Sequence, residues 1–249
     1  MIEREENDGI LTLRLAHGKV SAMDVELLEA LTAAFQEAEG ARAVVLTGTG
    51  GSFSAGVDLV RLTNEGEAYA RRFFPALRDF ILSAFTFPRP LVVAANGHAI
   101  AGGAVMTFAG DYRLMAEGNG RFGVPELLVG VPFPAIALEL VRYGAPAQHV
   151  QSLVFTGRLL SPAEALAQGV VDEVVASDAL LDRARQVADQ LGRIPPEIFA
   201  LTKRQLRADA VDRAARHADA DARALELWAS PETHTRIRDY LARTIKRST

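Results

Sequence analysis

The chain has 249 residues, of which 49% are hydrophobic and 23% charged, as in an ordinary globular protein. This length allows one large α/β domain, or one domain with an appendage. A net charge of −4 gives no global support for nucleic-acid binding, and the absence of cysteine excludes disulfides, thiolate metal sites and cysteine nucleophiles.

The first part of the chain predicts alternating strands and helices. Residues 10–15 alternate apolar and polar side chains, which is typical of a strand with one buried face. Asp24 is a good N-cap for a helix over residues 25–35, which Gly40 ends. The continuous apolar run 43–47 predicts a strand that is covered on both faces.

The same alternation continues along the chain. It predicts, in order, a helix at 67–84, a strand at 91–95, a short helix at 101–109, a strand at 112–115, a helix at 162–168, a strand at 170–175 and a helix at 178–191. Strands that alternate with helices indicate an α/β fold with right-handed crossovers. The uncharged stretch 90–110 is long enough to span a membrane, but Asn96, His98 and several glycines interrupt it. We therefore expect no membrane partner.

The Pro195–Pro196 pair marks the clearest boundary. We expect residues 1–195 to form an α/β core domain and residues 196–249 a helical region, with helices at 198–206 and 237–245. So few residues cannot bury a core alone, so this region must pack on the main domain, on another subunit, or on both. The acidic N-terminus carries no apolar signal segment, which together with the absence of cysteine favours a cytoplasmic location.

Two glycine-containing turns, at 54–58 and 96–103, each follow a predicted strand and lead into a helix. Turns at the carboxyl ends of neighbouring strands lie close together, at the edge where α/β sheets bind ligands. Each turn alone is also explained as a tight connection, so only the pair predicts a site. Residues 118–123 match G-x-G-x-x-G, but Pro125 follows in place of a helix, so no dinucleotide site is expected. The five histidines are scattered, so no metal site is expected.

Several segments in the same order resemble the crotonase (enoyl-CoA hydratase/isomerase) family. They are FSAGVDL at 53–59, PRPLVVAANG at 88–97, DYR at 111–113, TGRLLSPAEAL at 156–166 and GVVD at 169–172. The resemblance implies a superhelix of ββα turns followed by a C-terminal helical region that trimerises. It therefore implies a homotrimer or a homohexamer, with 196–249 as the oligomerisation region.

The resemblance also implies the residues of an active site. The backbone N–H groups of Val57 and Gly102 would hold an oxyanion, because Gly56 permits a sharp turn before Val57 and Gly102 begins a helix. Glu126, in FGVPEL, would transfer the proton. Hydratases of the family carry a second glutamate, and this chain has Val105 at that position.

The implied substrate is an acyl-CoA thioester, and no metal or redox cofactor is implied. By the same resemblance, backbone near Ala22 and Ser54 would contact the adenine end of CoA, and Lys203 would contact a phosphate. Asp58 and Asp111 are expected to cap helices or pair with cations rather than to react. His98 is expected to be a packed turn residue.

A single carboxylate that takes and returns a proton suits allylic isomerisation. It would remove a proton from C2 of a 3-enoyl-CoA and return it to C4, and the oxyanion donors would hold the dienolate between the two steps. Burial of Glu126 among Phe122, Leu127, Phe133 and Ile136 would raise its pKa and make it a stronger base. The alternatives are another single-acid enzyme of the family (a hydratase, decarboxylase or thioesterase) and a non-catalytic acyl-CoA-binding protein.

Overall fold

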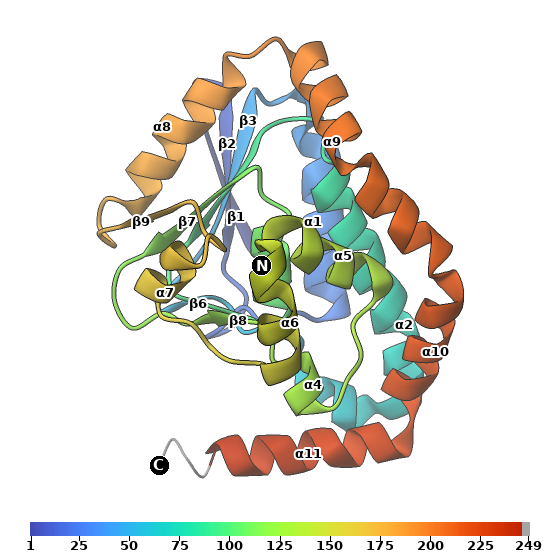
Figure 1. The fold of residues 1–249 in the computed structure, drawn as a ribbon. Helices are drawn as coiled ribbons and strands as arrows, with labels where there is room; N and C mark the ends of the chain where they lie inside the picture. Colours follow the sequence, from blue (N-terminus) through green and yellow to red (C-terminus); the bar gives the residue numbers. More distant parts are fainter. Residues whose placement is uncertain (246–249) are drawn as a thin grey trace.

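The computed structural model describes residues 1–245 and contains two sheets surrounded by helices (Figure 1). The last four residues of the predicted region 196–249 lie outside the described residues. The larger sheet has the strand order β1-β2-β3-β5-β7-β9. Its strands are β1 (Ile2–Asn7), β2 (Ile10–Leu15), β3 (Ala43–Gly48), β5 (Leu91–Ala95), β7 (Tyr112–Ala116) and β9 (Glu173–Val175). β1 is antiparallel to β2, and the remaining neighbours are parallel.

The smaller sheet consists of three short parallel strands, β4 (Ser52–Ser54), β6 (His98–Ile100) and β8 (Phe122–Gly123). Each follows one strand of the large sheet and precedes a helix. These helices are α2 (Leu59–Thr86), α3 (Gly102–Phe108) and α4 (Glu126–Val129). The chain thus repeats a ββα unit three times, so the predicted α/β fold of ββα turns is confirmed.

The central strands are buried on both faces, as their continuous apolar runs predict. All residues of β3 are buried, and they alternate between two cores. Val44 and Leu46 belong to the main core with α1 (Val25–Glu37). Ala43 and Val45 face the opposite side, where α8 (Leu180–Gly192) covers the sheet (Figure 1). Successive side chains of a strand point to opposite faces, so one apolar run serves both layers.

Helix α2 is longer than the sequence predicts. It begins after Asp58, whose carboxylate accepts a hydrogen bond from the Arg61 amide, and it bends at Gly66. The backbone of Gly66 (φ 73°, ψ −151°) lies outside the helical region. The predicted helix at 67–84 is therefore only the part of α2 that follows this bend.

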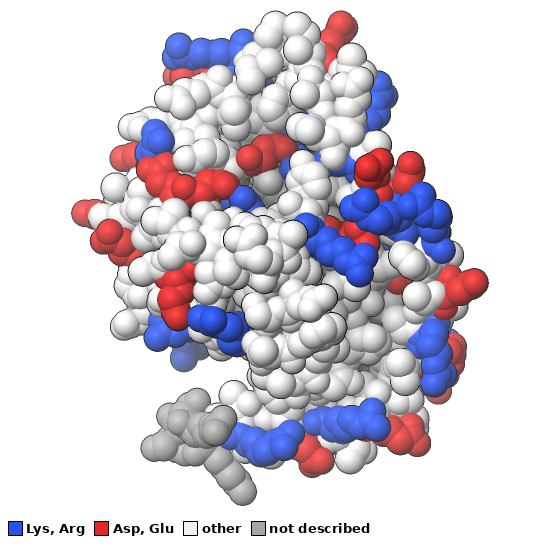
Figure 2. Space-filling model, in the orientation of Figure 1, with Lys and Arg blue, Asp and Glu red and all other residues white. Residues whose placement is uncertain are grey.

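The remaining connections are also mostly helical. They are η1 (Ala38–Gly40), α5 (Ala135–Gly144), α6 (Ala147–Thr156) and α7 (Pro162–Ala167). On the face shown in Figure 2, acidic and basic side chains are interspersed around an uncharged centre. No helix among residues 1–245 is long and apolar enough to cross a membrane. The cytoplasmic location stays a prediction.

The described chain ends with three helices, α9 (Pro196–Arg216), α10 (Ala218–Ala229) and α11 (Pro231–Ile245). Pro196 is the first residue of α9, where the sequence predicts the boundary. Helices α10 and α11 both contact α2, and Trp228 of α10 lies in the main core. The division at residue 195 and the oligomerisation role of 196–249 stay predictions.

Candidate active site

The Val57 and Gly102 amides lie in two turns that meet. A backbone bridge fixes the first turn, because the Met23 N–H donates to the Gly56 carbonyl at 2.7 Å and the Asp58 N–H donates to the Met23 carbonyl at 2.9 Å. This pattern leaves the intervening Val57 N–H unused. Gly102 is the first residue of α3, so its N–H has no partner within the helix. Neither amide donates to an acceptor within residues 1–245.

Glycine permits the close approach of these turns. Gly56 has a φ of 80°, and a Cβ atom added to it would lie 2.8 Å from the Ile100 carbonyl oxygen and 2.9 Å from the Gly102 nitrogen. A Cβ atom added to Gly102 would lie 2.8 Å from the sulfur of Met23. The side chain that meets an alanine at 102 first is therefore Met23.

Glu126 is the first residue of α4 and is buried, with 8% of its surface exposed. Its Oε2 has no hydrogen-bond partner within the described chain. Burial raises the pKa of this carboxyl group to about 8, and a contact with its own backbone N–H opposes the rise in part. A carboxyl group of this kind suits proton transfer near neutral pH.

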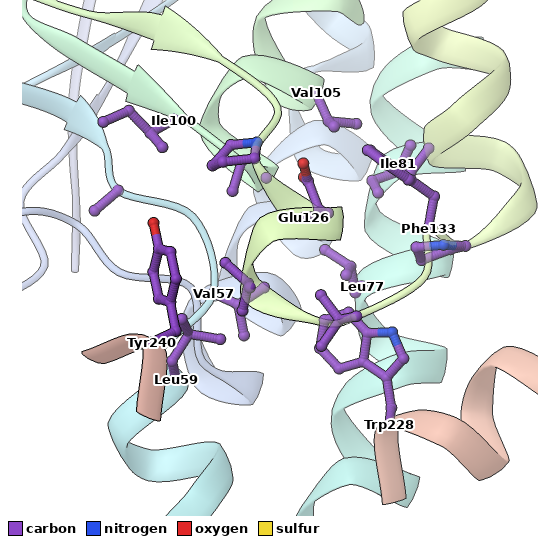
Figure 3. Close-up of a pocket in the computed structure, with 18 residues that line it drawn as sticks. Val57, Leu59, Leu77, Ile81, Ile100, Val105, Glu126, Phe133, Trp228 and Tyr240 are labelled. Atoms are coloured by element: carbon purple, nitrogen blue, oxygen red, sulfur yellow. The ribbon is translucent and has the colours of Figure 1, made fainter. Parts of the chain in front are cut away.

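Glu126, Val57 and Gly102 line one pocket of about 100 Å³ (Figure 3). Val105 of α3 lines the same pocket and is buried. The other lining side chains are almost all apolar, and Glu126 is the only carboxylate among the described residues of the wall. The two unused amides, one acid and an apolar wall therefore meet in one place.

Comparison with known proteins identifies the family of this site. The family model for enoyl-CoA hydratase/isomerase matches residues 5–241. The chain belongs to the enoyl-CoA hydratase/isomerase family. The predicted resemblance is confirmed.

The relatives of this chain within the family are named for different reactions. It is 31% identical over 227 residues to mouse mitochondrial enoyl-CoA delta isomerase 1, with 89% of this chain and 78% of the mouse protein covered. It is 36% identical over 207 residues to carnitinyl-CoA dehydratase of Salmonella paratyphi B, with 81% and 78% covered. The structure of human mitochondrial delta3-delta2-enoyl-CoA isomerase superimposes with a TM-score of 0.93 at 25% identity, covering 100% of this chain and 99% of that one. The protein is therefore a family enzyme whose reaction, isomerisation or hydration, these relatives leave open.

Two residues that the family resemblance assigns to CoA contacts are buried. Ser54 is 0% exposed, and its hydroxyl donates to the Ser21 carbonyl at 2.8 Å. Lys203 is 6% exposed, and its ammonium donates to Asp111 at 2.7 Å and to the Arg89 carbonyl at 3.1 Å. Both side chains thus make contacts within the fold, and the predicted contacts of the Ser54 backbone and of Lys203 with CoA stay predictions. Ala22 is half-buried, and its role stays a prediction.

Asp111 has the structural role that the sequence predicts. Its carboxylate pairs with Lys203 and Arg207 of α9 and accepts a hydrogen bond from the Leu91 amide. His98 lies in β6, and its buried Nδ1 has no partner within residues 1–245.

The neighbours of Glu126 differ in part from the expected set. Phe133 lines the pocket. Leu127, by contrast, is 43% exposed, and the ring of Phe122 packs against Phe108 with the centroids 5.3 Å apart. Ile136 is buried in the core but does not line the pocket. The expected burial of Glu126 is confirmed, while its apolar surroundings come mainly from other elements.

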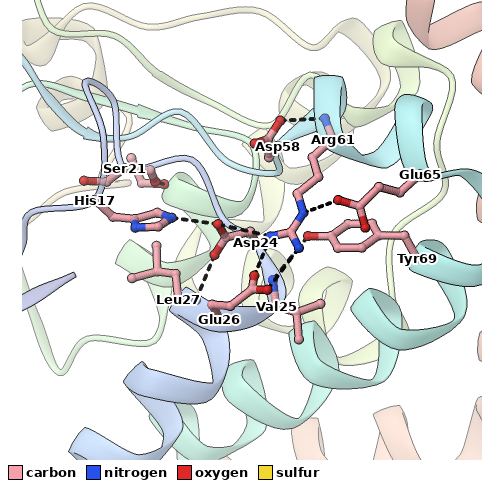
Figure 4. Close-up of polar contacts among 11 residues, drawn as sticks. His17, Ser21, Asp24, Val25, Glu26, Leu27, Asp58, Arg61, Glu65 and Tyr69 are labelled. Atoms are coloured by element: carbon pink, nitrogen blue, oxygen red, sulfur yellow. Dashed lines mark hydrogen bonds and ion pairs between the residues drawn. The ribbon is translucent and has the colours of Figure 1, made fainter.

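A polar cluster supports the turn that carries Val57 (Figure 4). Asp24 accepts a hydrogen bond from the Leu27 amide at 2.8 Å as the N-cap of α1, and its other oxygen lies 2.7 Å from Nε2 of His17. Arg61 of α2 lies 3.5 Å from the same oxygen of Asp24. Since Asp24 directly follows Met23, this cluster fixes the segment whose backbone bridges to Val57.

Sequence reasoning missed the contributions of α2 and of the C-terminal helices to the pocket. Leu77 and Ile81 of α2, Trp228 of α10 and Tyr240 of α11 all line it (Figure 3). The single tryptophan of the chain is a weak signal, because a lone aromatic residue in a helix is typical of any core. Only the three-dimensional packing shows which core it joins.

Proposed function

We propose that this enzyme is an enoyl-CoA isomerase that moves a double bond from the 3 to the 2 position, with Glu126 as the only acid/base. One observation carries the proposal: Glu126 is the sole carboxylate of the described pocket wall, and buried Val105 occupies the place expected for the second glutamate of a hydratase. Valine neither transfers a proton nor orients a water molecule.

The proposed reaction moves one proton in two steps. Ionised Glu126 takes a proton from C2 of the 3-enoyl thioester, and the electrons of that C–H bond form a dienolate whose negative charge lies on the thioester oxygen. The N–H groups of Val57 and Gly102 donate to this oxygen, and backbone donors fixed in this way are each worth about 3–4 kcal/mol in a dry site. Glu126 then returns the proton to C4, which leaves the double bond at the 2 position. These steps require no group beyond the CoA thioester of the substrate.

Hydration or dehydration is the second candidate, because a putative enoyl-CoA hydratase of Thermus thermophilus is 35% identical over 189 residues and the Salmonella relative is a dehydratase. Against it, the apolar wall around Val105 offers a nucleophilic water few polar partners. A decarboxylase, a thioesterase and a non-catalytic acyl-CoA-binding protein are further outcomes of the test.

The deciding assay follows double-bond position and hydration separately. Purified protein receives trans-3-enoyl-CoA and trans-2-enoyl-CoA thioesters, and we expect conversion of the first without hydration of the second. Glu126→Gln should lower the isomerisation rate by about 10²–10⁴. The exposed residue Glu117, changed to Gln, serves as the matched control and should leave the rate unchanged.

Three results would contradict the proposal. Fast hydration of the 2-enoyl substrate would make the protein a hydratase. A Glu126→Gln variant as fast as the parent would remove Glu126 from the mechanism. Tight acyl-CoA binding without turnover would favour a binding protein.

A further inference from the structure

The apolar pocket has an open end and a closed end. The open end lies at the turns, where Val57, Leu59 and Tyr240 are only partly buried. The closed end is formed by Leu77, Ile81 and Trp228, which are 4%, 3% and 2% exposed. A thioester held at the Val57 and Gly102 amides therefore points its acyl chain towards α2 and α10.

Trp228 is fixed in place by contacts on several sides. Its indole N–H donates to the Pro132 carbonyl at 2.8 Å, and its ring stacks on Phe73 with the centroids 5.9 Å apart and the planes at 22°. The ring of Phe74 meets the indole edge-on, with the centroids 6.0 Å apart. Nε2 of His234 lies 2.9 Å from the Trp228 carbonyl oxygen. A tryptophan held in this way does not swing aside to lengthen the pocket.

The volume of the pocket sets the size of the chain. An apolar cavity of about 150 Å³ holds one benzene molecule, which has six carbon atoms. On this scale the pocket volume of about 100 Å³ accommodates about four carbon atoms. We infer that the carbonyl carbon and C2 stay beside the Val57 and Gly102 amides while about four further carbons fill the acyl pocket closed by Trp228, Leu77 and Ile81. The site would then select short-chain thioesters of up to about six acyl carbons and exclude long-chain ones.

This inference deepens the proposed function but is tested separately by binding. Saturated butanoyl-, hexanoyl-, octanoyl- and decanoyl-CoA are titrated calorimetrically against the protein. Each methylene that enters an apolar pocket strengthens binding about fourfold, the equivalent of about 0.8 kcal/mol. We expect this gain from butanoyl to hexanoyl, and no further gain to octanoyl or decanoyl. Affinity that keeps rising fourfold per methylene up to decanoyl would overturn the inference.

Variants that widen or narrow the pocket should change the preferred chain length in opposite directions. Ile81→Ala widens the pocket from α2 and should extend the gain in affinity to octanoyl-CoA, and Trp228→Ala should do the same if that variant folds. Ala137→Val narrows the pocket from α5 and should weaken the binding of hexanoyl-CoA at least tenfold more than the binding of butanoyl-CoA. Ala165→Val is the matched control, because Ala165 is equally buried in α7 but does not line the pocket. Chain-length profiles that none of the pocket variants changes would also overturn the inference.

Turnover then distinguishes the two proposals. If hexanoyl-CoA is preferred but no 3-enoyl thioester is isomerised, the proposed function fails and the inference on chain length stands. If 3-decenoyl-CoA is isomerised as efficiently as 3-hexenoyl-CoA, as measured by kcat/KM, the proposed function stands and the inference on chain length fails.

Discussion

Replacing Glu126 with glutamine should make the protein more stable at alkaline pH, even as it removes activity. Burial raises the pKa of the folded carboxyl group to about 8, whereas the ordinary value is 4.5. Between these pH values the folded protein binds a proton at Glu126 that the unfolded chain has released. Stability therefore falls as pH rises, by up to about 1.4 kcal/mol per pH unit. Glutamine carries no charge, so the variant escapes this loss.

The expected magnitude follows from the same values. From pH 6 to pH 8 the free energy of unfolding of the parent falls by about 2 kcal/mol relative to that of Glu126→Gln. This loss corresponds to roughly 4–8 °C in Tm for a chain of this size. Thermal unfolding of both proteins at both pH values measures this difference. Leu128→Gln, an exposed neutral change on the same helix, is the control and should show one constant Tm difference from the parent. If the Tm of Glu126→Gln minus that of the parent stays constant or shrinks between pH 6 and pH 8, the reasoning on burial is refuted.

Three further predictions concern the same site and its support. The isomerisation kcat/KM should rise with pH, reach half its maximum near pH 8 and level off above about pH 9, because the ionised form of Glu126 is the base; a flat profile from pH 6 to pH 9 would contradict this. Gly102→Ala should lower kcat, because the added Cβ meets the Met23 sulfur at 2.8 Å, and a second change, Met23→Ala, should restore part of the rate. Lys203→Met should lower the free energy of unfolding by about 1.5–3 kcal/mol, because it removes one of the two cations that pair with Asp111 and leaves Arg207 in place, and should leave the KM of the CoA substrate unchanged. A higher KM without loss of stability would instead support the predicted contact of Lys203 with CoA.

The parts of the fold that the sequence predicts well are those with strong local signals. The apolar runs of β3 and β5 and the Asp24 cap of α1 allow one interpretation each, and the structure confirms them. Strand β1 was missed because residues 3–6 contain no apolar side chain, although their backbone pairs with β2. Strands β4, β6 and β8 were missed because two or three residues show no periodicity.

Some residues of the site were likewise predictable from the sequence, and others were not. The positions of Val57, Gly102 and Glu126 were predictable because family motifs surround each of them. The buried ion pair of Lys203 was not predictable, because a lysine is ordinarily expected in solvent and nothing local to α9 reveals its pairing with Asp111. Trp228 lies about 150 residues beyond Leu77 in the chain, so the pocket that they close together exists only after α10 packs on α2.

The burial of Glu126 has opposite consequences for catalysis and for the resting state. A base with a pKa of about 8 takes a proton from carbon more readily than one with the ordinary value of 4.5. At pH 7, however, only about one tenth of such groups are ionised in the empty pocket. The dienolate would also place a second negative charge nearby, which is tolerable only because Glu126 is neutral by then and the Val57 and Gly102 amides hold the oxyanion. A single acid in a dry pocket is therefore consistent with a reaction in which Glu126 takes the proton from C2 and returns it to C4. In such a reaction the negative charge of Glu126 and that of the dienolate are never present in the pocket at the same time.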